Sequence, residues 1–517
     1  FLAGTDKRAE AYAIGYTLIA ELRYPPSAVR MRTTLALNHI DDSQLDKAKV
    51  LLDEAQNLIR TEWGRVNRSG QGLYWMTRAE MEYNLTRAYH LRRTGKWQDG
   101  LHTARLAVDK GKELMALGGL VDERERNYGR SWFVSTMAQL ADQQVASGLY
   151  VEADMTLREA YRFAKAQGFT DNQMVRLFNA FSWLRNAVGQ FEEALAYSQR
   201  NEGIVLGQGQ AKGTPNWLFT QIPALQALAG LGRWPEAMAR LAVIDSETAR
   251  LKTRSSLSYQ PHMRGYILLH SDRPQDALRV LQGTMNWHLN NFGERHYFTA
   301  FTRGLYAAAL FRSGEREAAR QAFAQAVQNM TAPEALTGDF AESVYARKVK
   351  KYIFQTYIEL LAQSAGSNAA DAAEVFRLAD HLNASSVQQA LSDAAVRSAV
   401  SVPGLSEVVR QEQEAKNEMA ALQSYMLGQG AEGEARRNPQ VLEQMRERLR
   451  ALEGMRKEYK ARIQKGFPEY FQLIQPKAPS HTEIAQQLRA DELFVSVLPM
   501  AQSTYVWAID ASGQVQF

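Results

Sequence analysis

The chain contains no cysteine among its 517 residues. This absence excludes disulfide bonds, thiolate metal ligands and a cysteine nucleophile from these residues. The nine histidines are scattered, and neither an HExxH motif nor another metal-ligand pair at suitable spacing is present. The sequence therefore predicts no metal site, no cofactor and no catalytic residue within this chain.

Concentrated charge and long apolar runs are also missing. The formal net charge is only +5 over the whole length, which is too dilute for a face that binds nucleic acid. Apolar stretches such as residues 11–22 are too short or too interrupted to cross a bilayer. With 14 prolines and 45% hydrophobic residues, the composition is typical of a folded protein with two or more domains or one long solenoid. We expect neither a nucleic-acid partner nor a membrane span.

What the chain does contain is a repeated turn. A glycine is followed two residues later by an aromatic residue and five residues later by a small one. The copies have their glycine at Gly95, Gly148, Gly189 and Gly232, and weaker copies lie at Asp272 and Gly314. Over the best stretch the copies are 41 to 43 residues apart, a period typical of stacked helical hairpins.

Small residues recur at fixed distances from each turn. Those seven residues before it are Ala88, Ala141, Ser182, Gly265 and Ala307, and those twelve residues after it are Ala107, Ala160 and Ala326. We expect them where paired helices cross, because only small side chains allow close approach, and we expect the turn glycine to relax the backbone. The aromatic residue should fill the wedge to the next hairpin. The pattern resembles tetratricopeptide repeats and predicts an all-α, right-handed helical solenoid of seven or eight hairpins over residues 1–395.

Two amphipathic stretches and a β-rich tail follow the repeats. Apolar stripes over 405–426 and 442–463 predict a helical hairpin, either a projecting coiled coil or two ordinary packed helices, in a linker that covers 396–466. Within 467–517, residues 484–488 suggest a short helix. Residues 493–499 and 504–510 suggest strands, and 514–517 opens a third. Three strands alone make no stable domain, so we expect the chain to stop inside one.

The order of these segments resembles that of a known family. Residues 372–399 read AAEVFRLADHLNASSVQQALSDAAVRSA, GLSEVVRQEQEAKNEMAALQ begins at Gly404, FPEYFQLIQPKAP begins at Phe467, and LRADELFVSVLPMAQSTYVWAIDASGQVQF closes the chain. These stretches resemble the junction between tetratricopeptide arrays and the CHAT domain, a caspase-like module, together with the opening strands of that domain. The resemblance implies a cysteine peptidase of the caspase clan, or a degenerate relative, regulated by its own repeats. The family's histidine and cysteine lie downstream of these strands, so no catalytic residue is carried over and we expect this chain to lack peptidase activity.

An open array of hairpins also offers a groove lined by the first helix of each pair. Amides there would pair with the backbone of an extended peptide, guanidinium groups with a carboxylate, and rings with an apolar anchor. The candidate groove residues are Tyr89, Arg92, Arg176, Asn179, Trp183, Asn186, Gln226, Tyr259, His262 and Tyr266. Each could instead pack against the next hairpin or face solvent. We expect a protein or peptide partner in the groove and the caspase-like domain as a second partner.

Two hypotheses about function stay open. In the first, the repeats are the sensor region of a repeat-controlled caspase-like peptidase, and the hairpin linker transmits binding to it. In the second, the CHAT domain is degenerate and the protein is a non-enzymatic scaffold. An enzyme within the repeats is not supported, since GQGQAKG at 207–213 lacks the GK[ST] ending that phosphate binding needs. The lack of cysteine and of an initiating methionine slightly favours an exported, periplasmic bacterial protein over a cytoplasmic one, and a fragment of a longer chain explains both features equally well.

Overall fold

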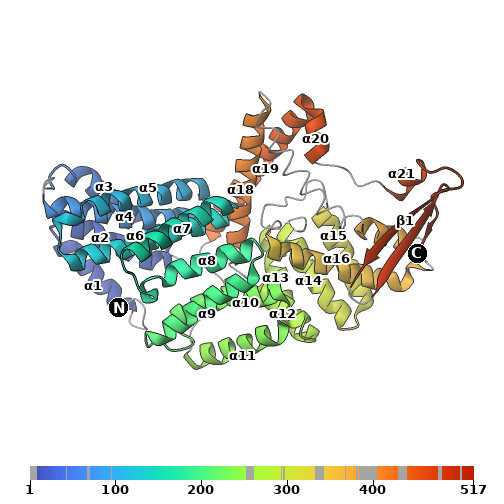
Figure 1. Cartoon of the computed structure of the whole chain (residues 1–517), viewed down its shortest axis with the longest axis horizontal. Coiled ribbons are helices and arrows are strands. Elements are labelled where there is room, and N and C mark those ends of the chain that lie inside the picture. Colours follow the sequence, from blue (N-terminus) through green and yellow to red (C-terminus); the bar gives the residue numbers. More distant parts are fainter. Residues whose placement is uncertain are drawn as a thin grey trace. The chain divides into compact units, whose positions relative to one another are not determined.

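The computed structural model describes residues 8–41, 44–66, 70–94, 96–251, 261–292, 294, 297–331, 343–366, 368, 370–379, 382, 404–428, 439–474, 480–500 and 503–517. The contacts divide the chain into two compact units. The first comprises Phe1–Tyr259 with Ala420–Leu449, and the second comprises Gln260–Met419 with Arg450–Phe517. Helices dominate both units, and one small sheet lies near the C-terminus (Figure 1).

The first unit begins with α1 (Arg8–Glu21) and continues as five helix pairs. The pairs are α2 (Pro25–Asp41) with α3 (Leu45–Glu62), α4 (Gln71–Arg93) with α5 (Trp97–Ala116), α6 (Glu123–Ala146) with α7 (Tyr150–Ala166), α8 (Val175–Ala187) with α9 (Phe191–Gly207), and α10 (Pro215–Leu231) with α11 (Trp234–Leu251). The two helices of each pair contact one another, and each first helix also contacts the first helix of the next pair. The first helices, α2, α4, α6, α8 and α10, therefore form one wall.

The second unit continues the pattern with three more pairs in its described residues. These are α12 (Pro261–Leu269) with α13 (Pro274–Phe292), α14 (Tyr297–Arg312) with α15 (Arg316–Thr331), and α16 (Val344–Ala365) with the helical residues 370–379. After them come α18 (Leu405–Gly428), α19 (Pro439–Gly466), α20 (Pro468–Ile474), α21 (His481–Ala485) and the strands β1 (Leu493–Pro499), β2 (Thr504–Asp510) and β3 (Val515–Gln516). The predicted fold class, a tetratricopeptide-like array of helix pairs with a helical hairpin and a short β-rich C-terminal segment, is confirmed.

The turns within the pairs share one hydrogen bond, which explains the repeated glycine. The backbone N–H after the turn residue donates to the carbonyl five residues earlier, for example from Gln190 to Arg185 at 2.8 Å. The same bond recurs from Lys96, Leu149, Arg233, Arg273 and Glu315. It requires a left-handed residue at the turn. Gly148, Gly189, Gly232 and Gly314 have φ between 73° and 89°, and Asp272 stands in the equivalent place with φ 54°. Gly95 lies outside the described residues.

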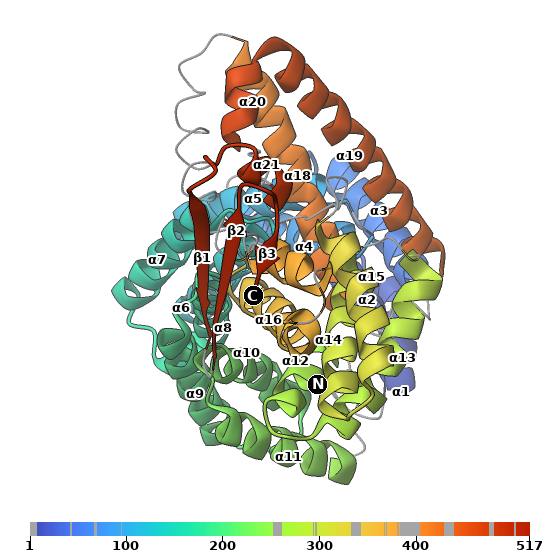
Figure 2. The ribbon, with the colours of Figure 1, turned by 90° about the vertical axis from the view of Figure 1, so that its right-hand side faces the viewer.

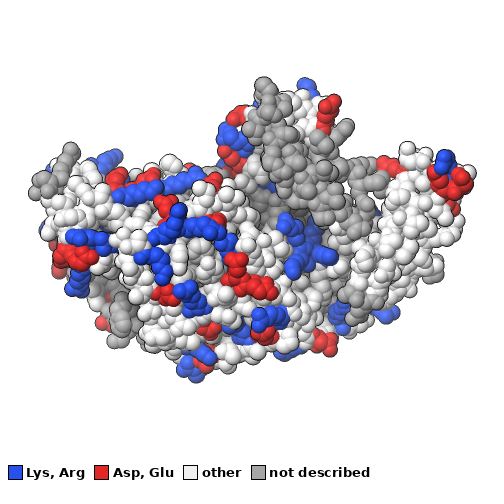
Figure 3. Space-filling view, in the orientation of Figure 1, with Lys and Arg blue, Asp and Glu red and all other residues white. Residues whose placement is uncertain are grey.

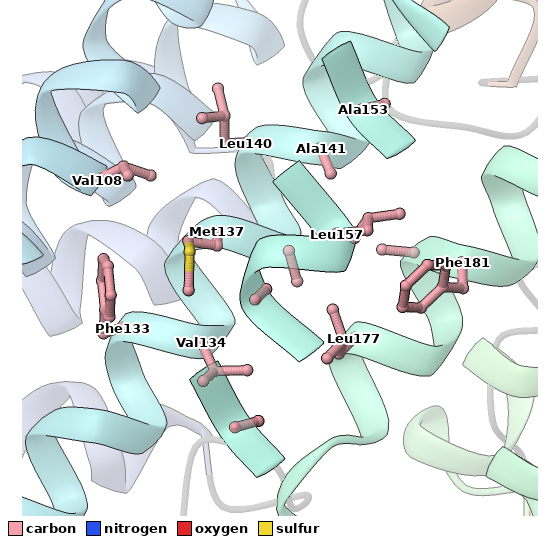
Figure 4. Close-up of a cluster of buried hydrophobic side chains, with 14 of the residues drawn as sticks. Val108, Phe133, Val134, Met137, Leu140, Ala141, Ala153, Leu157, Leu177 and Phe181 are labelled. Carbon is pink, nitrogen blue, oxygen red and sulfur yellow. The ribbon is translucent and has the colours of Figure 1, made fainter. Parts of the chain in front are cut away.

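The small residues lie where the helices cross, as predicted. Ala88, Ala107, Ala141, Ala160, Ser182, Ala307 and Ala326 all have 0% exposure. At the sixth pair, a Cβ on Gly265 would lie 2.8 Å from Leu281 of the partner helix, so no larger residue fits there without a shift. Figure 4 shows this packing around α6, α7 and α8, where Ala141 and Ala153 lie among Leu140, Leu157 and Leu177. The paired helices can therefore cross closely only because the side chains at the crossings are small.

The parts of α18 and α19 that belong to the second unit are antiparallel. Leu405, near the start of α18, belongs to the same apolar cluster as Ile463, near the end of α19. Farther along, Arg456 donates to Glu412 at 2.7 Å between helices that are largely closed to solvent at this point. A buried ion pair thus fixes the register of the two helices, while the apolar cluster fills the contact at one end.

The sheet has the order β1-β2-β3, and both neighbouring pairs are antiparallel (Figure 2). The three strands coincide with the predicted ones. On one face, Trp507 is fully buried and lies against Phe376 of the helical residues 370–379, with ring centroids 6.2 Å apart. The predicted short helix at 484–488 begins earlier, at His481, because Ser480 and Glu483 form a capping box there.

Candidate functional site

The wall of first helices in the first unit encloses a groove. A cavity of about 730 Å³ is lined from five successive first helices by Arg30, Thr33, Thr34, Leu37, Glu82, Leu85, Thr86, Tyr89, Arg92, Tyr128, Ser131, Trp132, Ser135, Gln139, Asp142, Gln143, Arg176 and Phe219. A second cavity of about 470 Å³ shares three of these residues and adds Trp75, Arg78, Arg124, Glu125, Asn127 and Gln173. We call the two connected cavities the inner groove. Almost all of the lining residues belong to the first helices of the pairs, which the repeat pattern places on the inner side of the array.

A closed network of charges holds one end of the inner groove together. Arg78 is 2% exposed, and its guanidinium donates to Glu82 at 2.9 Å and to Glu125 at 3.1 Å. Arg30 of α2 donates to the same Glu82 at 3.0 Å. The ring of Tyr128 lies 4.3 Å from the Arg78 guanidinium. Two arginines and two glutamates therefore balance one another and join α2, α4 and α6, as a buried charge must be paired to be tolerated.

A second group of charges in the inner groove is not closed in this way. The Oδ1 atom of Asp142, on α6, is buried and has no hydrogen-bond partner within the described chain. Burial raises the pKa of Asp142 to about 6, against the smaller opposite effects of Arg92 and Arg176. Among the same described residues the Nε of Arg92 is also buried without a partner, and its guanidinium lies 5.3 Å from the centre of the Tyr89 ring. We call Arg92, Asp142 and Arg176 the Asp142 subsite.

Aromatic side chains add apolar surface beside these charges. Tyr128 is 49% exposed and Phe219 is 43% exposed, although both belong to the groove wall. Trp132 lies on the same helix as Tyr128 and also lines the groove. Large rings that stay accessible in a concave wall are the residues that most often anchor a bound protein segment.

The structure places three of the predicted residues, Tyr89, Arg92 and Arg176, in the lining of the inner groove. Of the others, Asn179 contacts the neighbouring helix α10, and Trp183 contacts Asn179 on its own helix. The amide of buried Asn179 donates to the carbonyl of Phe219 at 3.2 Å and accepts from the indole of Trp183 at 3.0 Å. That carbonyl is four residues before Pro223, which has no N–H to offer it. The side chain of Asn179 therefore replaces a hydrogen bond that the proline removes from α10.

Asn186 has a similar role in joining α8 to α10. Its side chain is fully buried and donates to the carbonyl of Pro223 at 2.9 Å. Gln226 lies farther along α10, is half-buried and is not part of the groove lining. Tyr259 lies outside the described residues. For all of these residues, a part in ligand binding stays a prediction.

The last two predicted residues belong to the second unit. The ring of His262 stacks on His288 with centroids 5.2 Å apart, and its Nε2 lies 2.6 Å from Thr302 Oγ1. Burial lowers the pKa of His262 to about 4. Tyr266 is 6% exposed and makes edge contacts with Tyr345 and Tyr352, and burial raises its pKa. Both residues therefore lie within helix packing of their unit.

Asp142 was missed by the sequence analysis, although a signal for it exists. It directly follows Ala141, a small residue at a helix crossing, just as Tyr89 follows Ala88. The residue that directly follows the small one faces a different side of the first helix from the helix crossing. The same offset leads to Trp183 after Ser182. This offset identifies Tyr89 and Asp142 as wall residues, whereas at Trp183 and Tyr266 it leads to residues that are not part of the groove lining.

Other kinds of site receive no support from the described residues. None of the helices among them is long and apolar enough to span a membrane. A group of three or more His, Asp or Glu side chains able to hold a metal ion is also absent from the described part of the chain. On the face in Figure 3, basic and acidic side chains are interspersed over the helices of the first unit. That distribution is typical of a solvated surface rather than of a single-sign patch.

Comparisons with known proteins give little further assignment. No protein-family model matches the chain, and no curated protein matches it. Among solved structures, the apo form of RapI is similar over 85% of this chain and 99% of that chain, with 11% sequence identity and a TM-score of 0.28. The description of the helix pairs therefore rests on the contacts of this chain itself.

Proposed function

We propose that the first unit is a protein-binding module that holds an extended peptide segment of a partner in its inner groove. The observation that carries this proposal is the Asp142 subsite, where a buried acceptor and a buried donor both lack partners among the described residues, inside a cavity of about 730 Å³. Buried polar groups are almost always hydrogen-bonded, so an unsatisfied pair in a concave wall is a reason to expect a ligand. The cavity volume is also within the range of ordinary ligand sites.

An extended peptide fits this groove better than a compact small molecule. The lining is supplied by the first helices of five successive pairs, so the ligand must be long enough to pass several of them. A peptide backbone offers alternating N–H and C=O groups to the polar side chains along this path. Its side chains can rest on Tyr128 and Phe219, which provide exposed rings. Binding of this kind needs no cofactor.

The test uses soluble pools of random octapeptides passed over the immobilised chain. We expect retention by the wild type and loss of most of it in Phe219→Ala, because that change removes a ring from the groove wall. Val151→Ser is the matched control, since Val151 lies on α7, a second helix, and is 76% exposed. Equal retention by the wild type and Phe219→Ala would contradict binding in the inner groove.

We further propose that 467–517 belongs to a CHAT-like caspase module that the repeats regulate, with 1–395 as the array and 396–466 as the linker. The resemblance of the junction supports this, together with the outer face of the sheet. Leu493, Val495, Val497 and Val506 are between 46% and 63% exposed there, and an apolar face of this kind is usually covered. Cleavage of a peptide substrate by the full-length protein, with and without the groove ligand, tests the regulation. Identical rates would contradict it.

A non-enzymatic scaffold is the second candidate. The two candidates share the inner groove and differ in the module beyond it. A full-length protein that binds the groove ligand and cleaves no peptide in either state would identify the scaffold.

A further inference from the structure

We propose that the Asp142 subsite binds a carboxylate of the bound peptide, either an Asp or Glu side chain or the C-terminal carboxylate. This inference rests on the proposed peptide binding and adds the chemistry of one subsite. It is argued from the charges that line the inner groove and from the hydrogen bonds that the subsite leaves unmade.

The charges of the groove lining favour an acidic ligand. Arg30, Arg78, Glu82 and Glu125 neutralise one another in the closed network. The remaining charged residues of the lining are Arg92, Arg124 and Arg176 on one side and Asp142 on the other. Among the described residues these four form no ion pair within 4 Å. The inner groove therefore keeps an excess of positive charge, which a carboxylate reduces and an ammonium group increases.

The unmade hydrogen bonds lead to the same choice. Within the described chain, Arg92 presents a buried N–H that lacks an acceptor, and Asp142 presents a buried oxygen that lacks a donor. A peptide residue with a carboxylate can satisfy both, because the carboxylate accepts from Arg92 while a neighbouring backbone N–H donates to Asp142. A lysine side chain would satisfy only Asp142 and would lie beside two arginines. The carboxylate is therefore the better match.

The arginine is also held in place before a ligand arrives. The guanidinium of Arg92 lies 5.3 Å from the centre of the Tyr89 ring, one turn earlier on α4. A planar guanidinium that rests on a ring loses less freedom when it binds a carboxylate. Arg176 approaches from α8, so the ligand group would be contacted from two helices.

The experiment uses soluble octapeptide pools that are random except for one fixed central position, which is Glu, Gln or Lys. Each pool is made with a free and with an amidated C-terminus. The pools are passed over the immobilised full chain at pH 7.5, and retained peptides are quantified by mass spectrometry. We expect the Glu pool to be retained about tenfold more than the Lys pool, the ratio that one charge-assisted hydrogen bond typically produces. A preference that follows the free C-terminus instead assigns the terminal carboxylate.

Three substitutions at two positions sharpen the result. Arg176→Gln should remove most of the preference for carboxylate, whereas Arg176→Lys should keep part of it. Asp142→Asn should increase retention of the Glu pool a few-fold, since it removes the negative charge beside the arginines. Arg105→Gln on α5 is the control, because Arg105 pairs with Glu152 at the surface. Thermal melts verify that each variant is folded.

The outcomes separate this inference from the proposed function. Equal retention of the Glu, Gln and Lys pools overturns the carboxylate assignment and leaves peptide binding intact. Preferential retention of the Lys pool also overturns it and assigns a cation to Asp142. Failure to retain any pool contradicts peptide binding in the groove and, with it, this inference.

Discussion

Gly230 of α10 lies against the ring of Phe191, the aromatic residue that follows the turn of the preceding helix pair. A Cβ atom on Gly230 would lie 2.5 Å from this ring. Phe191 is 4% exposed, so it fills the wedge between two hairpins as its place in the repeat predicts. The fit depends on a large side chain in one helix pair and a missing one in the next.

Substitution of Gly230 by alanine tests this contact. We expect Gly230→Ala to lower the free energy of unfolding by about 1–2 kcal/mol, because steric strain outweighs the better helix propensity of alanine. Gly203→Ala on α9 is the control. Nothing lies within 4 Å of its added Cβ, so it should raise stability by about 0.5–1 kcal/mol. Urea unfolding measures both, and a Gly230→Ala variant at least as stable as the wild type would disprove the tight contact.

Substitutions at two left-handed turn residues, Asp272 of the sixth helix pair and Gly232 of the fifth, should change stability in opposite directions. Asp272 is left-handed with φ 54°, a conformation that costs a residue with a side chain. Asp272→Gly should therefore raise the free energy of unfolding by about 0.5–1 kcal/mol. Gly232→Ala should lower it by about 1 kcal/mol, since φ there is 73° while no protein atom within 3.4 Å obstructs the methyl group. Both changes are measured by chemical denaturation, and effects of the same sign would contradict the account.

Asp142 predicts how stability depends on pH. Burial raises its pKa from 3.8 to about 6, so the folded state holds this proton more tightly than the unfolded state. The folded protein therefore loses stability as pH rises from about 4 to 6 and stays lower above that range. Asp142→Asn removes this loss, so its advantage over the wild type should grow by roughly 1–3 kcal/mol between pH 4 and pH 8. Unfolding of both proteins at the two pH values, with exposed Asp109→Asn as control, measures the effect, and a constant difference would count against it.

Substitution of Arg78 tests how much the closed network contributes to the free energy of unfolding. Its removal leaves Glu82, which is 7% exposed, with Arg30 as its remaining partner in that network. We expect Arg78→Gln to lower the free energy of unfolding by about 3–5 kcal/mol, as for a broken buried ion pair. Arg105→Gln breaks a pair of half-exposed residues and should cost less than about 1 kcal/mol. Similar losses in the two variants would show that the network contributes no more than a surface pair.

The repeat could be predicted from the sequence because it depends on backbone geometry. Gly148 and Gly189 mark turns that need a left-handed residue, and Ala141 marks a crossing that needs a small one. These requirements place residues of the same kind at the equivalent positions of most copies. The strands could be predicted for a similar reason, since alternation and a turn at Ser512-Gly513 are local features.

The groove could be predicted only in part. Arg92 and Arg176 line the cavity because the phase of the first helix sets which residues face the inner wall, and their part in binding stays a prediction. Asn179 and Asn186 share that phase approximately, but their amides bind carbonyls of the facing helix, that of Phe219, to which Pro223 has no N–H to donate, and that of Pro223 itself. This depends on a residue about 40 positions away in sequence. Asp142 was missed because its importance comes from burial between two arginines, which only the assembled helices create.

The first helices differ in length, with 24 residues in α6 and 13 in α8. At 1.5 Å per residue, α8 is about 16 Å shorter than its neighbour. A short 3-10 turn, Asp171–Gln173, stands where further turns of α8 would lie, and Gln173 lines the smaller cavity beside Arg124 and Asn127 of α6. The size of the smaller cavity therefore depends on the length of α8 rather than on the chemistry of its side chains. Adding whole turns before Val175 would resize this cavity while keeping every residue of the Asp142 subsite, since Arg176 follows directly after Val175.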